Sequence, residues 1–175
     1  DSFESMDEKE ITDKIYSVVL KHYLNKIENN AKLAFPVIKH VYEKQREKYK
    51  RIVVPCTDGI KTLQVITDLE KAYNSDGEQL VTDFEKNISL AILDDSWKTH
   101  LRKMDELKQS VQLAVHEQKD PLLIYKFEAF ELFKTLIDSV NKEILSFLFK
   151  AEISTDNNKN VQEASSRRRP MNVNT

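Results

Sequence analysis

Residues that turn a chain are scarce in this sequence, which has 2 Gly and 4 Pro among 175 residues while 32% of its residues are charged. Sheet-rich folds need frequent turn residues, so this scarcity favours long helices. Neither Gly nor Pro interrupts Glu78–Leu113, where apolar residues recur at helical spacing. That segment is predicted to be one helix of about 54 Å, because an α-helix rises 1.5 Å per residue. We therefore expect a mainly α fold.

A second long helix is predicted directly after the first. Asp120 and Pro121 supply an N-cap and a first helical residue, and apolar side chains then follow one broad face as far as Leu148. The connection between the two helices is short, so the helices must run antiparallel and bury their facing stripes. Residues 84–153 are thus expected to form a long antiparallel helical hairpin.

Helical spacing also marks the first fifty residues. Ser5 with Glu8, and Asp7 with Glu10, each fit a capping box at the start of a helix. The apolar stripe that follows is expected to end or pause near residues 29–30, and a second stripe continues to about Tyr49. Pro36 lies within that second stripe and predicts a kink or a new first turn. This N-terminal helical segment is expected to pack with the helical hairpin.

A small β-hairpin insertion is predicted at about residues 51–67. Two β-branched runs, 51–55 and 60–66, flank an Asp-Gly pair, which is a strong signal for a tight turn. Pro55 lacks a backbone N–H and restricts the first strand to a sheet edge. An isolated hairpin is marginal in water, so this one is expected to pack on a helix or on a partner. One short helix, 68–73, is expected to follow it.

After Ile153 the composition changes to Asn, Ser and Arg, without an aromatic residue or an apolar period. Such a segment cannot bury enough surface to offset the entropy lost on ordering, so residues 154–175 are predicted to be a disordered linker tail. Arg167–Arg169 form a basic cluster that could touch anionic lipid or RNA. A solvated tail explains the cluster better.

No arrangement of residues indicates catalysis or a bound metal. The histidines, His22, His40, His100 and His116, never pair at ligand spacing, and the single cysteine, Cys56, has no evident partner. Two glycines cannot build a phosphate-binding loop. We therefore expect no catalytic residue, no metal site and no cofactor. The net charge of −2 gives no field for nucleic acid, and no apolar run reaches the roughly 20 residues of a membrane span.

Two features leave alternatives open. Trp97 lies on the apolar stripe of the first long helix and is most simply a core anchor, although it could instead anchor this helix on another domain. The polar loop 116–120 is either a plain connector or an exposed tip held out by two stiff helices. The pattern alone slightly favours the connector.

Several runs of residues follow one another in order between residues 84 and 133: Phe84-Glu85-Lys86, Leu93 to Leu101 with Trp97 and His100, Met104 to Gln109, Gln118 to Pro121, and Tyr125-Lys126 followed by Glu128, Phe130 and Phe133. In this order they resemble the helical scaffold domain of SecA, the ATPase family that drives preproteins through the bacterial SecY channel. The resemblance covers about 70 residues. Glu8–Asn30 is similar, more weakly, to the end of the helical wing domain.

The resemblance implies that the two long helices are a two-helix finger whose tip contacts the SecY channel and the translocating polypeptide. By position the tip comprises Val115, His116, Glu117, Gln118, Lys119 and Asp120. His116 stands where the family usually has a tyrosine, and an imidazole can also stack and hydrogen-bond. Ala114-Val115 stand where the family has Arg-Gly.

The resemblance also implies a division of the chain into a wing-like region with the β-hairpin insertion (1–77), a helical scaffold domain with the finger (78–153) and a linker tail (154–175). The chain begins at Asp1 without an initiator Met or a signal-peptide pattern, which indicates a piece of a longer protein. ATP and Mg would belong to motor domains outside it, so this piece would be non-catalytic.

The partners implied by the resemblance are the SecY channel complex, preproteins and the SecA motor domains. Anionic membrane lipids are a further expected partner, and no specific nucleic acid is expected. The implied location is the cytoplasm, peripherally at the inner face of the bacterial plasma membrane. The alternative from another class is a stand-alone helical adaptor or coiled-coil interaction module.

Overall fold

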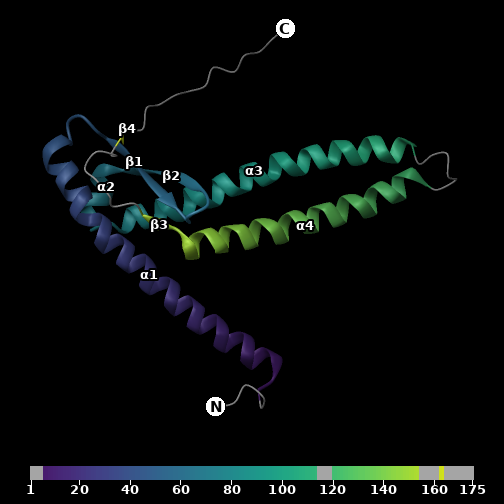
Figure 1. Ribbon diagram of the computed structural model, residues 1–175, viewed down its shortest axis with the longest axis horizontal. Helices are drawn as coiled ribbons and strands as arrows, with labels where there is room; N and C mark the ends of the chain where they lie inside the picture. The colour runs from purple at the N-terminus through teal and green to yellow at the C-terminus, as the bar shows by residue number, and fades with distance from the viewer. Residues whose placement is uncertain (1–5, 114–119, 154–161, 164–175) are drawn as a thin grey trace, which may run out of the picture. The chain divides into compact units, whose positions relative to one another are not determined.

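A computed structural model describes residues 6–113, 120–153 and 162–163 (Figure 1). Four helices, α1 (Glu8–Gln45), α2 (Leu69–Asn74), α3 (Glu78–Leu113) and α4 (Pro121–Lys150), account for most of these residues. The strands are β1 (Arg51–Thr57), β2 (Thr62–Asp68), β3 (Glu152–Ile153) and β4 (Gln162–Glu163). The prediction of a mainly α fold with a small β-hairpin insertion is confirmed.

The described residues form two compact units, which we treat separately. The first contains residues 6–84 together with 152–153 and 162–163, and the second contains residues 85–151. Their boundary falls inside α3, after Phe84, whereas the sequence placed a domain boundary before Glu78. The division into a wing-like region and a scaffold domain rests on the family resemblance and remains a prediction.

The N-terminal helix α1 is a single helix of 38 residues, so the predicted end or pause near residues 29–30 is wrong. Asp7 and Glu10 form the capping box, which selects the second of the two predicted registers. Pro36 lies inside the helix. Buried residues at 31, 34, 38 and 41 form one apolar stripe that continues past Asn29, Asn30 and Pro36. The packing of this stripe stabilises the helix.

The first unit packs α1 and α2 against the sheet. The rings of Tyr42 on α1 and Tyr73 on α2 stack with their centroids 4.1 Å apart. Thr67 is buried and donates a hydrogen bond from its hydroxyl to the carboxylate of Asp83 at 2.7 Å. The apolar core of this unit consists of Ala31, Ala34, Ile38, Val41, Ile52, Cys56, Val65, Leu69, Ala72, Leu80, Val81 and Phe84.

The predicted hairpin is confirmed, since β1 and β2 pair antiparallel from Arg51 with Asp68 to Thr57 with Thr62. The prediction that Pro55 confines β1 to a sheet edge is wrong. β1 is the central strand, with β2 on one side and β3 and β4 on the other. The second long helix also ends earlier than predicted, at Lys150, because Glu152 and Ile153 leave it to pair with β1.

The tail predicted to be disordered lies outside the described residues except at two positions. Gln162 and Glu163 form β4, so the prediction is wrong at these residues. Strand pairing supplies backbone hydrogen bonds, which composition alone does not reveal.

The turn between α2 and α3 depends on two residues with positive φ. Asp76 has φ 50° and Gly77 has φ 93°. The N–H of Gly77 donates to the carbonyl of Ala72 at 2.9 Å, and the N–H of Asp76 donates to the carbonyl of Tyr73 at 3.3 Å. These two bonds are those of a Schellman motif, which satisfies the last carbonyls of α2 and allows α3 to begin at once.

Cys56 is fully buried in β1, and burial raises the pKa of its thiol to about 12. At neutral pH the thiol is therefore protonated, and a protonated buried thiol is a poor nucleophile. Cys56 thus packs in the core of the first unit as a small apolar side chain.

Candidate functional site

The second unit contains α3 from residue 85 onward and all of α4, which run antiparallel and are drawn in teal and green in Figure 1. Asp120 begins α4 as predicted: its carboxylate accepts a hydrogen bond from the N–H of Leu122 at 2.9 Å, and Pro121 occupies the first turn. The N-cap fixes where the chain enters α4, because it satisfies a donor that has no partner within the helix. Asp120 is exposed.

The other predicted tip residues, Val115, His116, Glu117, Gln118 and Lys119, lie outside the described residues. Their assignment to a fingertip therefore stays a prediction. The described part contributes the two helices that lead to and from the tip, Glu78–Leu113 and Pro121–Lys150. Helices of this length are stiff supports, since each spans tens of ångströms at about 1.5 Å per residue.

Trp97 is 44% exposed, so it is not an ordinary buried core residue. Its ring lies 5.4 Å from the ring of His100, which is only 8% exposed and lies in turn 6.2 Å from the ring of Phe133 on α4. His100 thus contacts both helices, and Trp97 covers one side of its ring. Sequence reasoning did not identify His100 as a contact between the helices. Its spacing of three residues from Trp97, on the same helical face, was the available signal.

Beside Trp97, both helices expose large apolar side chains. The residues are Leu90, Leu93 and Leu101 on α3, and Phe127, Phe130, Phe133 and Ile137 on α4. We call this set, with Trp97, the apolar face of the hairpin. Its residues recur every three or four positions, so they line one side of each helix. An exposed face of this kind is typical of a surface that contacts another protein segment.

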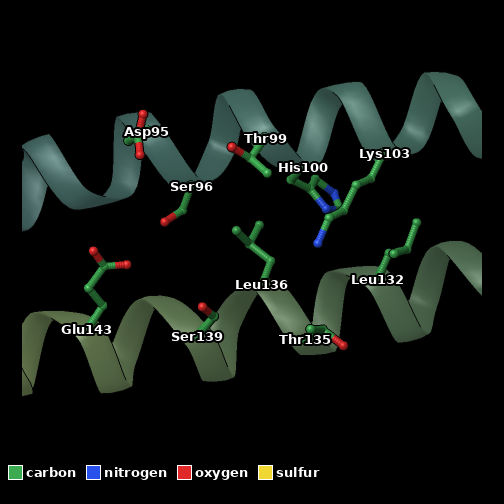
Figure 2. Close-up of a pocket in the computed structure, with 10 residues that line it drawn as sticks. All are labelled: Asp95, Ser96, Thr99, His100, Lys103, Leu132, Thr135, Leu136, Ser139 and Glu143. Carbon is green, nitrogen blue, oxygen red and sulfur yellow. The ribbon is translucent and has the colours of Figure 1, made fainter.

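The helix pair also has a groove whose lining includes many polar side chains. A groove of about 240 Å³ lies between α3 and α4, and Figure 2 shows His100 and Leu136 pointing into the space between the helices. The rest of the lining consists of the apolar Leu132 and of hydroxyl and charged groups, from Asp95, Ser96, Thr99, Lys103, Thr135, Ser139 and Glu143.

Within the described residues, no three His, Cys, Asp or Glu side chains lie together as metal ligands would. None of the helices described is both long and apolar enough to cross a membrane.

Comparison with known proteins identifies the architecture. Residues 2–152 match the family described as the SecA Wing and Scaffold domain. The protein translocase subunit SecA of Christiangramia forsetii is 60% identical over 164 residues, which are 94% of this chain and 15% of that protein. The SecA subunit of Flavobacterium psychrophilum is 58% identical over 170 residues, or 97% of this chain and 15% of that protein.

A more distant relative, the SecA subunit of Bacteroides fragilis, is 39% identical over 168 residues, which are 96% of this chain and 15% of that protein. The chain thus spans about 15% of the length of the curated relatives that it matches. No solved structure matches it. The family match extends over both units and includes the β-hairpin, and on this ground the chain belongs to the SecA wing and scaffold domain family.

Proposed function

We propose that this chain is a non-catalytic scaffold of a protein-export motor, and that the α3–α4 hairpin is its two-helix finger. The observation that carries the proposal is the helix pair itself. Two helices of 36 and 30 residues run antiparallel and lead to a short connection, in a chain that belongs to the SecA wing and scaffold family. A stiff pair of helices can transmit displacement from its base to its tip.

In this proposal the tip, residues 115–120, contacts the SecY channel and the preprotein, while the base moves with ATP-driven motor domains. ATP and Mg would be bound by those motor domains and not by this chain. The proposed location is the cytoplasmic side of the bacterial plasma membrane, where anionic lipids are a further proposed partner. Family membership supports this function over a stand-alone helical adaptor.

Trp97 and the apolar face have a specific place in the proposal. A tryptophan that is 44% exposed beside exposed leucine and phenylalanine side chains is suited to anchor a second protein segment. We assign Trp97 to an interdomain contact with the longer protein, which is one of the two alternatives that its sequence position left open.

Replacing residues 114–119 in the full-length protein by a Gly-Ser loop of equal length tests the proposed role of the tip. We expect preprotein transport to be mostly lost, because the side chains that contact the polypeptide would be gone while both helices remain. Transport into membrane vesicles is the measurement. ATPase activity without preprotein and the melting temperature are the controls, and both should stay near wild type. Transport at the wild-type rate would contradict the proposal.

A further inference from the structure

The residues of β1 whose backbone groups face away from β2 can be identified from the hydrogen bonds at the two ends of the β1–β2 pair. The N–H of Leu69 donates to the carbonyl of Lys50 at 3.0 Å, and the N–H of Asp58 donates to the carbonyl of Lys61 at 3.3 Å. Residues 50 and 58 therefore direct their polar backbone groups toward β2. Successive residues of a strand alternate between its two sides, so the outward-directed residues of β1 are the odd-numbered ones. They include Val53, Pro55 and Thr57.

Pro55 interrupts this outward edge, because it has no N–H to donate. The segment after α4 pairs on either side of it: Glu152 lies opposite Thr57 in β3, and Gln162 lies opposite Val53 in β4. Only Val54 and Pro55 separate the paired residues Val53 and Cys56 on β1, whereas eight residues separate Ile153 from Gln162. The chain thus adds two short strands where an uninterrupted edge would accept one continuous strand.

The two short strands differ in how firmly they are held. β3 follows α4 after a single residue, Ala151, which is fully buried and donates its N–H to the carbonyl of Phe147 at 2.7 Å. Glu152 also interacts electrostatically with Lys26 of α1. Burial lowers the pKa of Lys26, and the carboxylate of Glu152 partly offsets this by raising it. β4 pairs only after eight further residues, so its pairing costs loop-closure entropy that β3 does not lose.

We propose that the outer edge of β1 is a docking site for the chain's own segment after α4, with β3 as a fixed anchor and β4 as a latch that opens separately. In this proposal the β-hairpin has a binding role: by strand addition it holds the segment of the chain that follows α4. Pro55 keeps the latch weak, because it removes the donor that would join β3 and β4 into one strand. The proposal does not depend on the role of the fingertip.

Two proline substitutions in β4 form a matched test in the full chain. Gln162 lies opposite the outward-directed Val53, so its N–H is directed toward β1, and that of Glu163 is directed away. Gln162→Pro should therefore open the latch, whereas Glu163→Pro should leave it closed, because a residue before proline stays extended. Amide hydrogen exchange at Val53 and Thr57 measures the latch and the anchor separately.

We expect the Val53 amide to exchange about tenfold faster or more in Gln162→Pro, and to change little in Glu163→Pro. The Thr57 amide should keep its protection in both variants, which also shows that the sheet is still folded. In the wild type, Val53 should exchange faster than Thr57. Equal exchange of Val53 in the two variants, or an unprotected Val53 in the wild type, would overturn the proposal.

Discussion

The variant Gly77→Ala is expected to lose about 3–4 kcal/mol of unfolding free energy, because two costs add at one position. Gly77 has φ 93°, a backbone conformation that residues with a side chain rarely adopt. A Cβ there would also lie 2.8 Å from the carbonyl oxygen of Ala31 in α1. That neighbour is backbone of a buried helix stripe and cannot rotate away, so the turn or the helix must shift. Urea denaturation followed by circular dichroism measures the loss.

Gly59→Ala is the matched control for this prediction. Gly59 has a similar φ of 86°, but a Cβ there would meet no atom within 4 Å. Only the conformational cost remains, which is about 1–2 kcal/mol. The difference between the two variants thus measures the close approach of α1 to the turn before α3. Equal losses in both variants would mean that Ala31 does not limit Gly77.

Truncation of Phe84 to alanine is the second large effect, with an expected loss of about 3–5 kcal/mol in unfolding free energy. Phe84 is 2% exposed and belongs to the core of the first unit. Removal of its ring deletes buried apolar surface and leaves a cavity that close-packed neighbours fill only in part. The same urea titration measures this loss.

Phe127→Ala makes the same chemical change in a helix at a residue that is 66% exposed. Its expected loss is below about 1 kcal/mol, as for surface substitutions in general. Trp97→Ala should fall between the two in the isolated chain, since its ring is partly exposed. A Phe127 loss as large as that of Phe84 would show that the apolar face is covered in solution, by a second copy or another segment.

The long helices were predictable because their signals are local. Asp120 and Pro121 mark the start of α4, and apolar spacing without Gly or Pro marks α3 from Glu78 to Leu113. The hairpin was equally local, since Asp58-Gly59 lies between two β-branched runs. Capping, spacing and turn chemistry act over a few residues, so a single sequence contains them.

The failures were all decided by contacts distant in sequence. Asn29-Asn30 and Pro36 weaken a helix locally, yet buried residues such as Ala31 and Ile38 keep α1 continuous. Pro55 indicated an edge strand, but β3 pairs with Cys56 and Thr57 and β4 pairs with Ile52 and Val53 on that side, which the sequence pattern could not reveal. β3 and β4 are too short to carry a strand signal of their own.

For the candidate site, periodicity placed Trp97 and Phe133 on apolar stripes but could not say what covers them. An apolar stripe predicts burial, and the side chains of Trp97 and Phe133 are 44% and 47% exposed. In the proposed function, another protein segment packs on that exposed face. The assignment of the tip depended on residues that match the family's motifs in the same order along the chain, and not on any physical signal in the loop.

Site-specific photo-crosslinking from position 116 tests the proposed finger most directly. The crosslinker replaces His116 in the full-length protein, which is engaged with SecY-containing membranes and a stalled preprotein. The control carries it at Lys142, an exposed residue of α4 that lies about 32 Å from Pro121 along the helix at 1.5 Å per residue. The finger assignment predicts crosslinks to the channel or the preprotein from position 116 and none from 142. Crosslinks to neither partner from position 116 would contradict it.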